Sequence, residues 1–209
     1  MPIMEGRNPS SNNMNSGSPT HNHGTLHSII DWLKVIIIAL IISLPIRIFI
    51  AEPFVVNGAS MDPTFSTGQF LVVDRLTYRF NEPVRGDIIV FRYPNNPKVY
   101  FIKRIIGLPG ETVIIKSGQV SIISTGTPQG IILNEPYVTT SHRSMDNSTT
   151  MLGPDQYFVM GDNRLQSSDS RVWGALDESL IAGRPIVRLL PVNQLSVLPG
   201  IYHDYETAE

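Results

Sequence analysis

The sequence predicts an all-β fold, mostly antiparallel, preceded by one N-terminal transmembrane helix. Beyond Ala51, short runs rich in β-branched and aromatic residues are separated by Gly, Pro and Asn. Strand-length runs with frequent turn signals are typical of sandwiches and barrels and not of alternating βα units. Before Ala51 there is one longer apolar run. These two observations divide the chain into an anchor and a β domain.

Length and composition limit the classes of protein that the chain can belong to. With 209 residues and a formal net charge of −2, it has room for one compact domain and no electrostatic reason to bind nucleic acid. The chain contains no cysteine. Disulfides, thiolate metal sites and a cysteine nucleophile are therefore excluded.

The N-terminal part divides into a polar tail and an apolar segment. Residues 1–27 are rich in Asn, Ser, Gly and Pro and are predicted to be disordered. Residues 28–51 are predicted to form the transmembrane anchor, in which an uncharged stretch is flanked by Lys34 and Arg47. A span needs about 20 apolar residues, which this segment reaches if both basic side chains extend to the interfaces. A cleaved signal peptide and a buried amphipathic helix of a soluble domain are the alternatives.

Residues 52–209 are predicted to form the β domain, in which each of eight apolar segments holds one strand or more. Residues 116–147 have weaker apolar patterning and many Ser, Thr and Gly, and are predicted to form an inserted subdomain. One short helix is expected over 177–183, with Asp177 as its N-cap and Gly183 past its end. The eight segments are 54–58, 69–76, 86–94, 98–110, 111–123, 130–136, 156–163 and 183–191.

Lys103 is a candidate general base. Alternation along the strand places it on the same face as Val99, Phe101 and Ile105. An apolar environment disfavours the ammonium form and lowers the pKa of a lysine, which arginine cannot match. The competing interpretation is a structural lysine at a strand edge or in a buried ion pair.

Ser60 is a candidate nucleophile. It lies between the small residues Gly58 and Ala59 and the turn residues Asp62 and Pro63. Small neighbours let a substrate backbone approach, and the Ser60 amide can point at a developing oxyanion. A serine that only makes local hydrogen bonds in a turn is the competing interpretation.

A polar loop follows the apolar strand at 156–160. Its residues, GDNRLQSSDSR, include Asp162, Arg164, Asp169 and Arg171, which are able to pair and rigidify it. A loop that is merely solvated is the alternative.

These three features together resemble the type I signal peptidase family. The order is an anchor, then SMDPTF from Ser60, RGDIIVF from Arg85, KRIIGLPGE from Lys103 and GDNR from Gly161 followed by SSDSR. The resemblance covers most of the chain and implies a largely antiparallel β fold of the signal-peptidase kind. It also implies a membrane-bound serine endopeptidase that removes signal peptides from exported precursors, without cofactor or metal.

The resemblance also implies roles for particular residues. Ser60 would be the nucleophile, Lys103 the general base and Ser167 the hydroxyl that orients the lysine amine. Asp162 and Arg171 would support the site. Two positions depart from the family pattern: Leu165 and Gln166 stand where polar Asp or Asn is more common. A third, Gly58, stands where some members carry a serine that helps the oxyanion hole, so the donors here are expected to be backbone amides.

The substrate and the topology follow from the same resemblance. Cleavage is expected after small-x-small motifs, and apolar Phe54, Val56 and Met61 are candidate walls of the binding site. The expected partners are signal-peptide-bearing precursors and the lipid bilayer, with no nucleic acid. The catalytic domain must then lie on the extracytoplasmic side and residues 1–27 in the cytoplasm.

Other functional classes have less support from the residues. Of the five histidines, His21, His23 and His27 precede the anchor, while His142 and His203 lie in no motif, which disfavours a Ser-His-Asp triad. No HExxH or similar ligand spacing is present. Self-cleaving repressor proteases share the serine/lysine chemistry but carry a DNA-binding module in place of the anchor. A membrane-tethered β domain that binds without catalysis is the candidate from a non-enzymatic class.

Overall fold

The structure is a computed structural model that describes residues 23–45 and 51–202. The chain forms two units, with residues 1–43 in the first and residues 44–209 in the second. Most of the disordered tail predicted over 1–27 lies outside the described residues. The prediction ended too late, however, because helix α1 already begins at His23. Extending a helix that has nucleated fixes one residue for each hydrogen bond gained, so the flanking polar residues join it.

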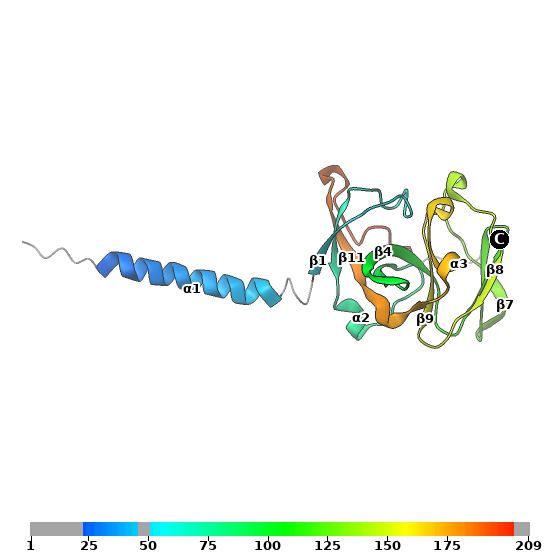
Figure 1. The fold of residues 1–209 in the computed structure, drawn as a ribbon, viewed down its shortest axis with the longest axis horizontal. Coiled ribbons are helices and arrows are strands. Elements are labelled where there is room, and N and C mark those ends of the chain that lie inside the picture. The colour runs from blue at the N-terminus through cyan, green and yellow to red at the C-terminus, as the bar shows by residue number, and fades with distance from the viewer. Residues whose placement is uncertain (1–22, 46–50, 203–209) are drawn as a thin grey trace, which may run out of the picture. The chain divides into compact units, whose positions relative to one another are not determined.

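Helix α1 (His23–Pro45) is the long helix of the first unit (Figure 1). All of its described side chains, from Ile29 to Ser43, are exposed, and most of them are large and apolar. Near its middle, Lys34 Nζ lies 3.0 Å from an Asp31 carboxylate oxygen. Among the described residues, no helix combines the length and the apolarity that a bilayer span requires. The segment predicted as the anchor, 28–51, overlaps α1 as far as Pro45. Its last residue, Ala51, is already the first residue of strand β1 (Ala51–Val55).

Most of the regular elements of the second unit are strands, as Figure 1 shows. The strands are β1 (Ala51–Val55), β2 (Phe70–Asp74), β3 (Ile88–Tyr93), β4 (Asn96–Gly107), β5 (Thr112–Lys116), β6 (Gln119–Ser124), β7 (Thr127–Ile132), β8 (Ser148–Met151), β9 (Gln156–Met160), β10 (Leu176–Asp177), β11 (Ile181–Leu190) and β12 (Ser196–Val197). The helical turns are α2 (Thr77–Phe80), α3 (Ser170–Trp173), η2 (Thr140–His142), η3 (Arg164–Gln166), η4 (Glu178–Leu180) and η5 (Val192–Gln194). The prediction of a mostly antiparallel β fold is confirmed.

The larger sheet holds the elements that form the site. Its strand order is β1-β2-β11-β3-β4-β9-β10, with β12 paired to β11. Neighbouring strands are antiparallel, and Lys103 on β4 pairs with Ile89 on β3. The last long strand in the sequence, β11, thus lies between β2 and β3.

A second sheet of order β7-β6-β5-β8 is formed by residues between Thr112 and Met151. The insertion predicted over 116–147 falls within this range. Strands β5 and β6 are joined at Ser117 and Gly118, which both have positive φ values, 48° and 79°. Two consecutive positive φ values suit the twist of a tight hairpin. The space beside Gly118 is filled by the Ser144 carbonyl, so a side chain there would clash.

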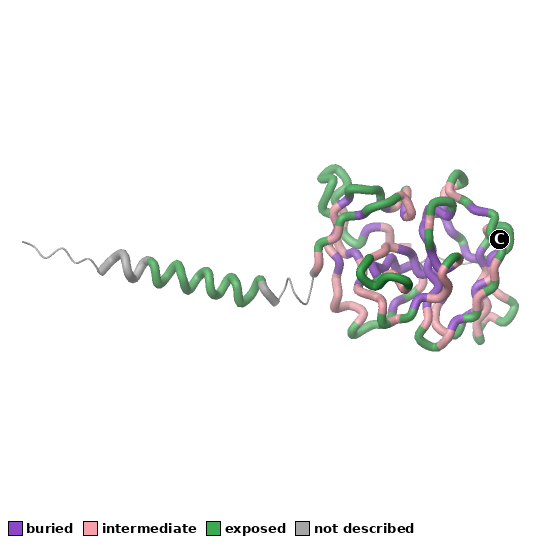
Figure 2. Tube along the Cα trace, viewed as in Figure 1, coloured by how far each residue is buried: buried purple, intermediate pink, exposed green. Residues whose placement is uncertain are grey.

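Three buried apolar clusters hold the second unit together, and Figure 2 shows the buried residues running through its strands. One lies mainly between the second sheet and the ends of β4 and β9, and includes Ile106, Val113 and Phe158. Another surrounds Ile89 and Phe91 on β3. The third packs Met61 and Phe65, which follow Ser60, against β2 and β3. The serine loop is therefore anchored in the core.

The short helix predicted over 177–183 is wrong in extent. It is one 3₁₀ turn, η4, capped by Asp177, whose side chain accepts a hydrogen bond from the Ser179 amide. It ends at Leu180 because Ile181 already pairs with Phe91 in the sheet. The expectation of a single helix in the domain is also wrong, since α2 and α3 each form one turn.

Candidate active site

Ser60 lies in the loop between β1 and β2, and its backbone is fixed from both sides. The next residue, Met61, is buried, and the Phe65 amide donates to the Met61 carbonyl at 2.8 Å. The Ser60 carbonyl accepts a hydrogen bond of 3.1 Å from the Asn163 amide. The serine hydroxyl is thus presented on a turn that is tied to the loop after β9.

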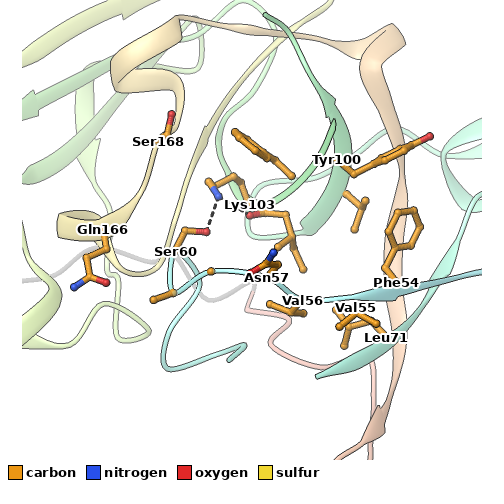
Figure 3. A pocket seen from close by; sticks show the side chains of 15 residues that line it. Phe54, Val55, Val56, Asn57, Ser60, Leu71, Tyr100, Lys103, Gln166 and Ser168 are labelled. Atoms are coloured by element: carbon orange, nitrogen blue, oxygen red, sulfur yellow. Dashed lines mark hydrogen bonds between the residues drawn. The ribbon is translucent and has the colours of Figure 1, made fainter. Parts of the chain in front are cut away.

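Lys103 projects from the middle of β4 directly toward this serine. Its Nζ lies 2.7 Å from Ser60 Oγ and donates to the Ile102 carbonyl at 2.9 Å. Figure 3 shows the lysine–serine contact as a dashed line. The lysine is 3% exposed, and its Nζ lies 5.2 Å from the centroid of the Phe101 ring. Two residues 43 positions apart therefore form one hydrogen-bonded pair.

Burial changes the acid–base behaviour of the lysine. Desolvation lowers the pKa of Lys103 from 10.5 to about 8, although the carboxylates of Asp169 and Asp162 act in the opposite direction. A lysine with a pKa near 8 has a substantial neutral fraction at mildly alkaline pH. Its lone pair is then available to accept a proton from the serine hydroxyl at hydrogen-bond distance.

The pair opens into a cavity of about 260 Å³. Figure 3 shows its side chains, with Phe54, Val56 and Leu71 on one side of Ser60 and Gln166 on the other. Predicted wall residues Phe54 and Val56 line the cavity. Met61 does not belong to its lining, because its side chain packs into the core with Phe65 and Leu71.

Asp162 is buried behind the site and holds two elements together. Its carboxylate accepts two hydrogen bonds from Arg104, from Nε at 2.8 Å and from Nη2 at 2.7 Å. It also accepts a hydrogen bond of 2.5 Å from the Thr64 hydroxyl. The guanidinium of Arg104 further donates to the carbonyls of Gly86 and Gly200. Asp162 thus joins the serine loop to the strand that carries the lysine.

Arg171 organises the loop after β9 from the side of α3. Its Nε and Nη2 each donate to the Asp169 carboxylate at 2.8 Å, and Nη2 donates to the Arg164 carbonyl at 2.8 Å. It also forms an ion pair with Asp146, which lies in the connection between β7 and β8 of the second sheet. Asp169 in turn accepts a hydrogen bond of 3.1 Å from the Gly161 amide. Arg171 supports the loop without lining the cavity.

Ser167 and Gly58 have distinct positions. The buried Ser167 hydroxyl has no hydrogen-bond partner among the described residues and packs against Gly161. Gly58 has φ of +102°, which favours glycine, and there is open space where its Cβ would be. Its amide donates to the Thr67 hydroxyl at 3.1 Å. The Gly58 amide is therefore already engaged within its own turn.

Of the five histidines, His142 is the one whose side chain the structure describes. His142 lies in η2 and is not part of the cavity lining. His203 and His21, and the side chains of His23 and His27, lie outside the described residues. Within the described part of the chain, no group of three or more His, Cys, Asp or Glu residues is arranged to hold a metal ion.

Comparison with known proteins connects this geometry to a family. The family model described as "Signal peptidase, peptidase S26" matches residues 29–190. Signal peptidase I of Leptolyngbya laminosa is 39% identical over 177 residues, covering 81% of this chain and 84% of the relative. Signal peptidase I S of Bacillus subtilis (strain 168) is 38% identical over 179 residues, covering 80% of this chain and 92% of the relative.

The chain belongs to the signal peptidase family, peptidase S26. It is accordingly a type I signal peptidase, which is a serine peptidase. A crystal structure of a signal peptidase I from Enterococcus faecalis V583 is also similar, with 30% sequence identity and a TM-score of 0.42. It covers 50% of this chain and 97% of the crystallised chain.

Several residues that line the peptidase's cavity were not among the candidate site residues predicted from the sequence. They belong to β1 and the serine loop, to β2, β3 and β4, and to the loop after β9: Val55, Asn57, Ala59, Leu71, Val90, Tyr100, Phe101, Ile102, Gln166 and Ser168. Tyr100 and Phe101 both line the cavity, although alternation puts them on opposite faces of an ideal strand. Gln166 carried a signal, since it stands at one of the positions that depart from the family pattern.

Replacement of Gly161 by alanine is expected to lower the peptidase's kcat/KM by about a hundredfold, because small displacements of reacting groups have effects of that size. An added Cβ would meet the Ser60 carbonyl, and it would lie 2.7 Å from Ser167 Cβ. Ser60 must then move. Gly126→Ala is the matched control, since nothing lies within 4 Å of its Cβ position. Equal cleavage rates for the two variants would contradict the expectation.

Proposed function

We propose that this peptidase removes signal peptides from exported precursor proteins by a Ser60/Lys103 dyad. The observation that carries the proposal is the 2.7 Å contact between Ser60 Oγ and the amine of a lysine that is only 3% exposed. A buried, partly neutral amine beside a serine hydroxyl is what base-assisted nucleophilic catalysis requires. No histidine is needed for this chemistry.

Proton transfer and acyl transfer proceed on these two residues. The neutral Lys103 amine takes the proton of Ser60 as its oxygen attacks the scissile carbonyl. The resulting ammonium gives that proton to the leaving amine, so the peptide bond breaks and an ester to Ser60 remains. The amine then takes a proton from a water molecule as that water attacks the ester, and it returns the proton to the Ser60 oxygen as the carboxylic acid product leaves. The Ser60 amide is the donor that we assign to the oxyanion.

The remaining site residues act by positioning. Asp162 and Arg171 fix the loop after β9 against the strand that bears Lys103, through the contacts with Arg104 and Asp169. We assign Ser167 the role of orienting the lysine amine, since its buried hydroxyl keeps unused hydrogen-bonding capacity. Gly58 supplies no side-chain donor, so the oxyanion relies on backbone amides.

The cavity supports cleavage after small-x-small motifs. Phe54 and Val56 give it apolar walls close to the proposed nucleophile, and these suit the short apolar side chains of such a motif. Both belong to the segment that leads from β1 into the serine loop. Substrate residues flanking the cut would lie against them.

The proposed membrane topology rests on α1. Its described side chains are exposed and mostly apolar, which is unfavourable in water and favourable against lipid. We assign α1, from residue 28 to Pro45, to a single-pass anchor, with the N-terminus in the cytoplasm and the catalytic domain on the extracytoplasmic side. Reporter fusions at both ends of the chain would test it, and reporters found on the same side would contradict it.

Ser60→Ala tests the catalytic proposal directly. Detergent-solubilised full-length protein is incubated with a defined precursor, and the released mature protein is sequenced at its N-terminus. The wild type is expected to cut at the signal junction, and Ser60→Ala is expected to show no cleavage while unfolding at an unchanged temperature. Ser141→Ala, an exposed serine outside the cavity, is the control. Cleavage by Ser60→Ala at the wild-type rate would refute the proposal, and a non-catalytic binding domain would leave the precursor uncut in every case.

Activity is expected to fall as the pH is lowered through the pKa of Lys103, which burial brings to about 8. Only the neutral amine is a base, so kcat/KM should decrease about tenfold for each pH unit below the pKa. Above it the rate should level off. The profile is measured with one peptide substrate between pH 6 and 9.5. A rate that is constant from pH 6 to 8 would show that Lys103 is not the base.

A further inference from the structure

A second cavity lies on the catalytic unit, and none of its residues contributes to the cavity at Ser60. Its volume is about 210 Å³. It is bordered by the end of β2, by α2, by β3 and by the start of β11. Three of its lining residues are arginines, Arg75, Arg79 and Arg92, and two others, Tyr78 and Ser179, carry hydroxyl groups.

The positive charge in this cavity is only partly neutralised. Arg75 pairs with Glu52 at 3.3 Å, while both side chains stay about one third exposed. Within the described part of the chain, neither Arg79 nor Arg92 forms an ion pair with a carboxylate. Arg92 lies on β3 opposite Tyr100 of β4. Among the ion pairs of the described residues, the three arginines of this cavity therefore share one carboxylate partner, Glu52.

The other carboxylates near the cavity are occupied. Asp87 accepts hydrogen bonds from the Tyr78 hydroxyl at 2.9 Å and from the Val84 amide at 3.2 Å. Asp74 accepts from the Leu76 amide at 2.7 Å and from the side chain of Thr77. These hydrogen bonds from their own loops and turns occupy acceptor sites of both carboxylates.

A fourth arginine, Arg184, stands on β11 two residues after Ala182, which lines the cavity, but Arg184 does not belong to the lining. It adds a positive charge to the strand that borders the cavity.

We infer that this cavity binds a phosphate group through Arg75, Arg79 and Arg92. Guanidinium groups offer pairs of parallel N–H donors that match phosphate oxygens, and they are hydrated more weakly than an ammonium. Three guanidinium groups can donate to a tetrahedral anion from different sides. Together they carry more N–H donors than the two oxygens of one carboxylate can accept.

Two sources of phosphate fit this chemistry, a lipid headgroup and free inorganic phosphate. Glu52, the partner of Arg75, is only seven residues after Pro45, the last residue of α1. If α1 is the membrane anchor proposed above, the cavity is joined by a short connection to the bilayer, where headgroup phosphates are concentrated. The inference of a phosphate site does not depend on that anchor.

The test uses full-length, ¹⁵N-labelled protein in dodecyl maltoside and chloride buffer, with the arginine Nε–Hε NMR signals as the readout. One arm titrates inorganic phosphate. The other adds phosphatidylglycerol to the micelles, with diacylglycerol as the matched lipid that lacks phosphate. Variants Arg79→Gln and Arg79→Gln/Arg92→Gln are compared with Arg143→Gln, which removes the same charge from an exposed site elsewhere.

We expect saturable shifts of the Arg79 and Arg92 signals in at least one arm. The apparent Kd should rise about tenfold or more in Arg79→Gln and stay unchanged in Arg143→Gln, since one charge-assisted hydrogen bond has that effect. Shifts with phosphatidylglycerol alone identify a headgroup site, and shifts with inorganic phosphate alone identify a site for free phosphate. No saturable shift in either arm, or equal weakening by Arg143→Gln, would overturn the inference. Cleavage of a precursor is measured separately, so this outcome leaves the Ser60/Lys103 proposal untouched.

Discussion

Lys103→Met is expected to abolish cleavage, with a loss in kcat/KM of at least about a thousandfold, because the serine loses its general base. Methionine has a similar length and no basic nitrogen. The Ser60 hydroxyl would keep its place in the loop but would have no acceptor for its proton. The rate is measured with the same peptide substrate used for the wild type, at pH 9, where the wild-type amine is mostly neutral.

The same replacement is expected to raise stability at neutral pH. A lysine whose pKa is lowered from 10.5 to about 8 on folding disfavours the folded state whenever it is charged. Below pH 8 the whole penalty is present, and it amounts to about 3 kcal/mol. Between pH 8 and 10.5 the unfolded chain binds more protons, so the wild type gains stability as pH rises. The advantage of Lys103→Met should therefore be largest at pH 7 and shrink toward pH 10.5.

Lys98→Met is the matched control, since Lys98 lies on the same strand and is exposed. It should change neither the cleavage rate nor the pH dependence of the free energy of unfolding. Urea titrations at pH 7 and 9.5 measure the difference. A Lys103→Met protein that is less stable than the wild type at pH 7 would show that the lysine contributes more by its contacts than it costs by burial.

Asp162→Ala is expected to lower the free energy of unfolding by about 3 to 5 kcal/mol. The Arg104–Asp162 pair is 1% and 0% exposed in its side chains, so the guanidinium would lose its counter-charge inside the protein. The Thr64 hydroxyl would also lose its acceptor beside the serine loop. Cleavage should fall together with stability, because the loop and the lysine strand would no longer be joined.

Two comparisons separate this effect from a general loss of charge. Asp146→Ala removes a carboxylate that is 46% exposed, and its partner Arg171 keeps its pair with Asp169, so the change should cost about 1 kcal/mol or less. The double variant Arg104→Met/Asp162→Leu removes both buried charges and should be more stable than Asp162→Ala alone. Chemical denaturation measures all three. If Asp146→Ala and Asp162→Ala proved equally destabilising, burial of the pair would not be the cause.

The strand pattern and the two reacting residues could be read from the sequence because each depends on local chemistry. A lysine among apolar residues of a strand and a serine between small and turn-forming residues both carry their signal in a few neighbours. No local pattern in the sequence predicts the distance between Ser60 and Lys103, because that distance depends on how β1, β3 and β4 are arranged within one sheet.

The partners in ion pairs between residues far apart in the sequence could not be predicted either. Asp162, Arg164, Asp169 and Arg171 were expected to pair within their loop, and Arg171 does pair with Asp169. Asp162 instead binds Arg104, and Arg164 binds Glu135 of the connection after β7. Charge patterns in a sequence identify residues that need partners, but packing between distant segments selects the partners.

The position of β11 has a consequence for the order of synthesis. The strands on the nucleophile's side, β1 and β2, and those on the base's side, β3 and β4, are joined in the sheet only through β11. A nascent chain carries Ser60 and Lys103 long before residues 181–190 are made. We therefore expect the proposed Ser60/Lys103 pair to come into register only after that strand has been translated and inserted. The peptidase is then expected to stay inactive while its own chain is still emerging.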